Sequence, residues 1–211
     1  MRALVFLFLI FQFSSYSQEK KEFYFDHLGH RITKEYFYSN KKFVEGEIKY
    51  LHLVFENDTS TTSVLHPRKV YGKLNKTDLD SLRSKLNSIS ESNPISYKSH
   101  IVINYFSGNY PISLKKPTGW NIYHNDYKRK LDRIIDSNMY WIYNDIEDLK
   151  FQRKKRLWVK DEEHFIKNLF FPFHIPYGNF VIIKPDGNYI CFYGEYGKQS
   201  VWNVAKEIIG N

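Results

Sequence analysis

The second half of the chain alternates short apolar runs with amphipathic runs, and this order restricts the folds that it can adopt. From Ser99 onward the pattern predicts a strand, a helix, a strand, a helix, a hairpin and a last helix. Strands are expected at 101–106, 139–143, 180–183 and 189–193, and helices at 125–135, 161–169 and after Gly197. Parallel strands joined by a helix connect through a right-handed crossover, which places helices on both faces of the sheet. The sequence therefore predicts an α/β fold in which helices flank a mixed sheet.

The clearest turn signal joins the last two predicted strands. Pro185, Asp186, Gly187 and Asn188 separate two apolar runs, a pattern typical of a β-hairpin. The segment after the hairpin carries apolar residues at helical spacing, which predicts one buried helix face. These residues are Val201, Val204, Ala205, Ile208 and Ile209.

The first half of the chain is predicted to be an N-terminal α+β extension covering residues 18–95, and residues 96–211 are predicted to form the main domain. The run YLHLVF at 50–55 predicts a strand, and a weaker strand is expected around 70–72. The segment 88–94 is rich in serine and ends at a proline, which is typical of a linker.

One helix is predicted within this extension. Its apolar stripe consists of Leu79, Leu82, Leu86 and Ile89. Thr77 is expected to cap the helix, because Asp80 lies three residues further on, as in a variant capping box.

The first 17 residues have the pattern of a signal peptide. Arg2 supplies a positive charge, residues 4–13 are almost entirely apolar, and Ser15 and Ser17 flank a cleavage position before Gln18. The apolar run is shorter than the roughly 18–20 residues that cross a bilayer. A buried N-terminal strand is the alternative interpretation. We expect an exported chain, periplasmic or secreted.

Residues 99–211 resemble the thioredoxin-like superfamily in the order of their elements. The run IVINYF at 101–106 is similar to the strand that leads into the redox loop of the family. The segment 174–176 resembles the one that carries the family's cis-proline, and residues 180–194 resemble its closing hairpin. The resemblance implies a thioredoxin-like mixed sheet flanked by helices, with an active-site rim next to Pro176.

The chain departs from this family at the redox motif. Tyr110, Pro111, Ile112 and Ser113 stand where the family has Cys-x-x-Cys, and the loop continues for about a dozen residues before the next predicted helix. Cys191 is the only cysteine of the chain, so neither a redox pair nor an internal disulfide can form within it.

Two interpretations of Cys191 follow. Its neighbours Ile190 and Phe192 are apolar, which favours a packed thiol that is not ionised. An exposed Cys191 beside a cation would instead support a single-cysteine thiol oxidoreductase or a peroxidase-like enzyme.

The leading hypothesis is a thioredoxin-like protein without thiol redox activity that binds a protein or peptide partner. The binding surface implied by the resemblance is the rim formed by Tyr110, Ser113, Pro176 and Tyr177. No catalytic residue and no cofactor is assigned.

Other chemistry has weaker support in the sequence. Ser113 would act as a nucleophile only with a histidine base such as His124 or His174 within reach. His27 and His30 have a spacing that zinc accepts on a helix, but Gly29 between them favours a turn. No metal site is therefore predicted.

The net charge of +8 fits an anionic partner as well as a simple solubilising surface. Arg153, Lys154, Lys155 and Arg156 form a basic run that could contact an anionic glycan or a membrane surface, or could be a solvated loop. No nucleic-acid partner is expected, because the chain is predicted to be exported.

Overall fold

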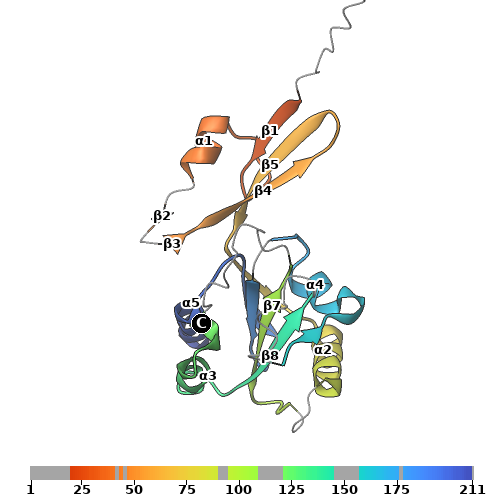
Figure 1. Ribbon diagram of the computed structural model, residues 1–211, viewed down its shortest axis with the longest axis vertical. Helices are drawn as coiled ribbons and strands as arrows, with labels where there is room; N and C mark the ends of the chain where they lie inside the picture. The colour runs from red at the N-terminus through yellow and green to blue at the C-terminus, as the bar shows by residue number, and fades with distance from the viewer. Residues whose placement is uncertain are drawn as a thin grey trace, which may run out of the picture.

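The computed structural model describes residues 20–40, 43–44, 47–89, 95–108, 121–144, 157–175 and 178–210. Within these ranges the protein is mixed α/β, with a six-stranded and a three-stranded sheet. The three-stranded sheet lies over one end of the six-stranded sheet (Figure 1). No helix in the described ranges is both long and apolar enough to cross a membrane.

The six-stranded sheet is mixed. In spatial order its strands are β6 (Lys69–Lys73), β11 (Asn188–Phe192), β10 (Gly178–Ile183), β7 (His100–Phe106), β8 (Ser137–Tyr143) and β9 (Val159–Lys160). Strands β7, β8 and β9 are parallel, whereas β10 is antiparallel to both of its neighbours and β6 is antiparallel to β11. Strands β7, β8, β10 and β11 confirm the four strands predicted from the second half of the sequence.

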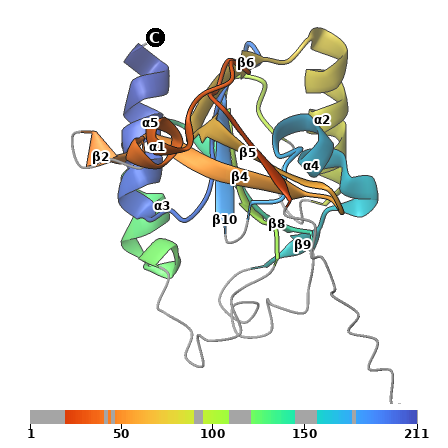
Figure 2. The same ribbon diagram turned by 90° about the horizontal axis from the view of Figure 1, so that it is seen from above.

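Helices cover both faces of this sheet, so the mixed α/β architecture expected from the sequence is present. Helices α3 (Asp126–Leu131) and α5 (Lys198–Gly210) lie on one face, and α2 (Lys76–Ser88) and α4 (Phe165–Phe170) lie on the other (Figure 2). Short 3₁₀ turns, η1 (Asn121–Tyr123) and η4 (Glu162–His164), precede α3 and α4.

The core consists of two apolar layers, one on each face of the sheet. Alternate residues of a strand point to opposite faces, so Val102 of β7 packs with α3 and α5 while Ile101 and Ile103 pack with α2 and α4. Every residue of β10 is buried. A strand covered on both faces reads as a continuous apolar run, as 180–183 does.

Strand β6 and helix α2 belong to the six-stranded sheet and its helical cover, although both precede residue 96. Residues 69–73 pair with β11, and Leu82 and Leu86 of α2 are fully buried. The sequence had placed both elements in the N-terminal extension. In the structure, the part of the chain outside the six-stranded unit ends near Pro67.

The start of α2 differs from the sequence-based prediction. Asn75, not Thr77, is the N-cap, and its side chain accepts a hydrogen bond of 2.8 Å from the backbone N–H of Asp78. Asparagine is among the strongest N-cap residues, and it lies two positions earlier in the chain.

The predicted helix at 161–169 is interrupted. Glu163 and His164 have left-handed backbone conformations, with φ of 57° and 54°, so the 3₁₀ turn η4 ends before α4 begins at Phe165. At the start of α3, the side chain of Asn125 makes no capping hydrogen bond.

The N-terminal unit is a three-stranded sheet with one helix. Its strands lie in the order β1 (Lys21–Phe25), β5 (Ser60–Pro67) and β4 (Tyr50–Glu56). Helix α1 (Lys34–Ser39) covers one face of this sheet. The short strands β2 (Phe43–Val44) and β3 (Glu47–Ile48) pair with each other. Phe37 of α1 packs with Tyr24 and Leu65 in a small separate core. Strand β4 confirms the predicted strand at 50–55, whereas β1 and β5 were not expected.

Candidate functional site

The four residues predicted to form the binding rim, Tyr110, Ser113, Pro176 and Tyr177, lie outside the described residues. The predicted signal peptide and the basic run at 153–156 also lie outside them. The described residues nevertheless define the ends of the strands to which the rim segments are joined. Tyr177 directly precedes β10, and Tyr110 follows Gly108 by two residues.

Cys191 is buried on β11, the second strand of the sheet, as its apolar neighbours indicate. The residue is 1% exposed and packs in the apolar layer between the sheet and helices α2 and α4. Burial raises the pKa of the Cys191 thiol far above its ordinary value, because an apolar environment disfavours the charged thiolate. The thiolate is the reactive form, so this position is unsuited to nucleophilic or redox turnover.

The carboxyl ends of β7 and β8 meet at one edge of the sheet, where β10 begins. Asn179 links three elements at this edge: its Nδ2 donates to Ser107 Oγ at 2.8 Å, and its Oδ1 accepts the backbone N–H of Gly194 at 2.8 Å. The side chains of Asn179 and Ser107 are buried. These bonds fix the ends of β7, β10 and β11 relative to one another.

A second buried polar group stabilises the neighbouring layer. Asn104 Oδ1 accepts hydrogen bonds from the hydroxyl groups of Tyr127 and Tyr196, both at 2.9 Å. Burial raises the pKa of Tyr196 well above its ordinary value, so its hydroxyl stays protonated and donates. This cluster joins β7 to α3 and to the segment before α5, and its role is structural.

Asp161 holds the start of α4 against the same edge. Its carboxylate accepts the backbone N–H groups of Ile166 and Lys167, both at 2.9 Å, and the hydroxyl of Tyr105 at 3.2 Å. Desolvation by burial, followed by the negative charge of Asp161, raises the pKa of Tyr105. The carboxylate thus accepts three hydrogen bonds from within the fold, which makes it a positioning group.

A narrow recess lies between β7, β8 and α4 at this edge, and the volume in it that a water molecule could occupy is about 0 Å³. Ser107, Asn144 and Lys167 supply its polar wall, and Phe173 and His174 stand on its exposed rim. The Oδ1 of Asn144 is buried and accepts no hydrogen bond from the described part of the chain. The ring of Phe173 is 38% exposed, so it is the part of this rim that a ligand can reach.

The three-stranded sheet packs beside this recess. The ring of His66 lies 5.3 Å from that of Phe173 and 4.7 Å from that of Tyr193, and Phe55 lies 6.2 Å from Phe173. Burial lowers the pKa of His66, so the imidazole is neutral at pH 7. Strands β4 and β5 thus add aromatic surface to the edge of the six-stranded sheet.

Arg68 fastens the connection between the two sheets. Its Nε donates to the carbonyl of Tyr193 at 3.2 Å, its Nη2 donates to the carbonyl of Glu195, and its guanidinium lies 4.7 Å from the centre of the Phe192 ring. Leu51 lies against Gly194, whose φ of +81° suits glycine. The relative position of the two sheets is therefore held by directional contacts as well as by apolar packing.

The other candidate chemistry from the sequence does not assemble. Gly29 has a φ of +84° in a turn, and His30 pairs with Asp26 at 3.2 Å, so His27 and His30 do not share a helix face. Among the described residues, no group of three metal-ligating side chains is close enough to hold a metal ion. His124 lies 3.5 Å from Lys198, and His174 lies on the rim of the recess.

Sequence reasoning missed Ser107, Asn144 and Asn179 as residues of this edge. All three are polar residues directly after or at the start of a buried apolar strand, which is the available signal. Their partners lie far away in the sequence, 72 residues apart for Ser107 and Asn179.

Comparisons of the chain with protein-family models, with curated proteins and with solved structures find no match.

Proposed function

We propose that this protein is a thioredoxin-like binding module that works without thiol redox turnover and binds an extended protein or peptide segment. The binding site is the edge of the six-stranded sheet where β7 and β8 end. The proposal extends to the predicted rim residues Tyr110, Ser113, Pro176 and Tyr177, which belong to segments joined to this edge.

The sheet order supports the thioredoxin-like interpretation. Strands β11, β10, β7 and β8 are adjacent in this order, with β10 antiparallel to the others, and the helices α3, α4 and α5 follow β7, β9 and β11. Four such strands with helices on both faces agree with the superfamily that residues 99–211 resemble. Strands β6 and β9 extend this arrangement at its two sides.

One observation carries the location of the binding site: the recess between β7 and β8 lies at the point where the chain changes direction across the sheet. From β7 the chain passes through α3 on one face to β8 and then to β9, and from β9 it returns through α4 on the other face to β10, on the opposite side of β7. In open α/β sheets, ligands bind outside the carboxyl ends of the strands at such a switch point.

The exposed rings beside the recess suit a peptide. Phe173 together with Phe55 offers a ring surface for an apolar side chain. The buried Cys191 explains why the site would bind without exchanging electrons. The alternative enzyme needs an accessible thiolate, which the environment of Cys191 disfavours.

The test is a selection of random twelve-residue peptides displayed on phage against residues 18–211, followed by fluorescence anisotropy with a synthetic selected peptide. Phe173→Ala and Tyr177→Ala should each weaken binding about ten-fold, as expected for loss of one aromatic anchor. Tyr97→Ala is the matched control, because Tyr97 is an exposed ring that precedes β7 at the opposite edge of the sheet. A selection that yields no binder, or binding unaffected by both rim substitutions, would contradict the proposal.

A further inference from the structure

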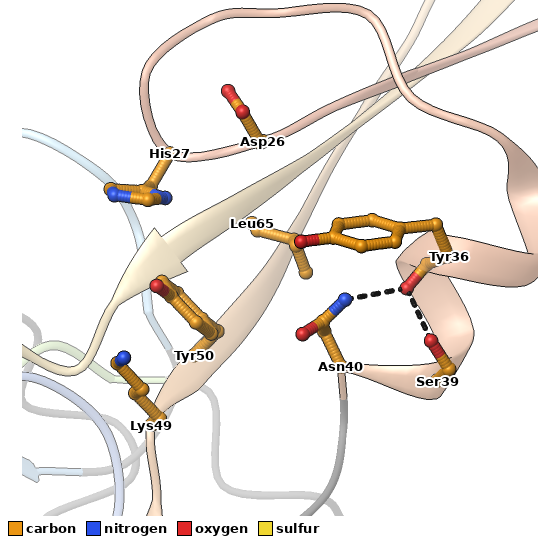
Figure 3. Close-up of a pocket in the computed structure, with 8 residues that line it drawn as sticks. All are labelled: Asp26, His27, Tyr36, Ser39, Asn40, Lys49, Tyr50 and Leu65. Carbon is orange, nitrogen blue, oxygen red and sulfur yellow. Dashed lines mark hydrogen bonds between the residues drawn. The ribbon is translucent and has the colours of Figure 1, made fainter.

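The N-terminal unit contains a second pocket, remote from the recess between β7 and β8. It lies between the turn after β1, the end of α1 and the first residue of β4, and its volume is about 510 Å³ (Figure 3). Small-molecule sites typically have volumes of about 300–1,000 Å³. The pocket is therefore large enough for a ligand of one or two rings.

The walls of this pocket are fixed by hydrogen bonds within the protein. Asp26 accepts the backbone N–H groups of Leu28 at 2.9 Å and His30 at 2.8 Å, which closes the turn that forms one wall. Thr33 caps α1, and Asn40 Nδ2 donates to the carbonyl of Tyr36 at 2.8 Å, which fixes the opposite wall. A preformed pocket loses little conformational freedom when a ligand binds.

Aromatic rings and neutral polar groups face the interior. The ring of Tyr50 lies 5.2 Å from that of His27, and the ring of Tyr36 stands on the opposite side with Leu65 between them (Figure 3). The Tyr36 hydroxyl and Asn40 Oδ1 both point toward the space between these rings (Figure 3). The interior therefore offers flat apolar surface next to one hydroxyl and one amide oxygen.

Charged groups are confined to the border of the pocket. The Asp26 carboxylate is turned toward the backbone of its own turn, where His30 also pairs with it. Burial acts to raise the pKa of Asp26, but the hydrogen bonds from His30 and Leu28 outweigh it and lower that pKa, so the group is ionised. Lys49 is exposed, and its Nζ lies 5.4 Å from the centre of the Tyr50 ring. One positive and one negative border charge favour a neutral ligand over an ionic one.

We propose that this pocket binds a neutral saccharide unit. A sugar ring has one face of C–H groups that packs on an aromatic ring, and its hydroxyl groups need donors and acceptors beside that face. Tyr50 and Tyr36 supply the ring surface, and Asn40 Oδ1 and the Tyr36 hydroxyl supply the hydrogen bonds. This inference does not depend on the proposed peptide site.

The test uses saturation-transfer difference NMR on residues 18–211 with four probes, namely maltose, cellobiose, lactose and N,N′-diacetylchitobiose. At least one probe should give a signal, and Tyr50→Ala should weaken its binding about 3- to 10-fold through loss of ring contact. Tyr36→Phe should weaken binding about 3- to 10-fold, the range for one hydrogen bond. Tyr36→Ala serves as a second truncation, because this half-exposed ring can be removed without disturbing a core.

Two matched controls separate this site from other surfaces. Lys49→Ala should leave binding of the neutral sugar within about two-fold, and Phe173→Ala should leave it unchanged while it weakens peptide binding. Absence of a signal from all four probes would overturn the proposal. Stronger binding of a sulfated disaccharide that is lost in Lys49→Ala would also overturn it, because the pocket would then select an anion. Sugar binding that survives Tyr50→Ala and Tyr36→Ala would place the ligand elsewhere.

Discussion

Asn179→Ala tests the claim that one buried amide holds the edge of the sheet together. The substitution removes the 2.8 Å bond to Ser107 Oγ and leaves the backbone N–H of Gly194 without its acceptor. Asn179 is fully buried, so no bulk water replaces these bonds. Leaving one buried donor unsatisfied costs about 1–3 kcal/mol, and the lost hydroxyl bond adds about 1 kcal/mol.

The expected loss for Asn179→Ala is therefore about 2–4 kcal/mol in the free energy of unfolding. For a chain of this length that corresponds to a fall in Tm of roughly 4–16 °C. Urea unfolding followed by tryptophan fluorescence measures the loss. Asn203→Ala, on the exposed face of α5, is the control and should stay within about 0.5 kcal/mol of the parent protein. A loss below 0.5 kcal/mol for Asn179→Ala would refute the structural role of this amide.

Three further outcomes are expected. Leu82→Ala, at a fully buried position of α2, should cost about 2–5 kcal/mol in urea unfolding, and a loss below 1 kcal/mol would show that α2 does not cover the sheet. Burial lowers the pKa of His66 and His100 in the folded protein below 6.5, so the unfolded chain takes up protons first as the pH drops. The free energy of unfolding should therefore fall below about pH 6.5. A double His66→Gln, His100→Gln variant that shows the same fall would contradict this cause. N-terminal sequencing of the protein recovered after expression with an export machinery should begin at Gln18, and retention of Met1 would contradict the predicted signal peptide.

The second half of the fold could be predicted because its strands are buried on both faces. The runs at 101–106 and 180–183 are continuous and apolar, and the turn at 185–188 has the residues that a hairpin requires. Strand β5 could not be predicted in the same way. Its sequence STTSVLHP is mostly polar, since it forms part of a small sheet that buries only Ser63 and Leu65 from this strand.

The organisation of the first half was harder to predict for a related reason. The strand at 69–73 has no buried residue, because it is the outermost strand on one side of the six-stranded sheet. Its membership of that sheet depends on pairing with residues 188–192, more than a hundred positions further along the chain. Local patterns identify such a strand only weakly, and they contain no information about its partner.

The candidate site was located only in outline. The resemblance directed attention to the segments after 106 and before 178, which do leave from one edge of the sheet. The residues that define the recess in the structure are single polar side chains brought together by tertiary contacts. Asn144 is an example, since many loop residues directly follow a buried strand and only the folded chain brings this one beside Lys167 and Phe173.

The most direct test of the central claim is the rate at which Cys191 reacts with a thiol reagent such as 5,5′-dithiobis(2-nitrobenzoic acid) at neutral pH. A thiol that is 1% exposed, and whose pKa is raised by burial, should react slowly in the folded protein. In denaturant, one equivalent should react at once. Fast, stoichiometric reaction of the folded protein would show an accessible thiolate and would contradict a binding module without thiol chemistry.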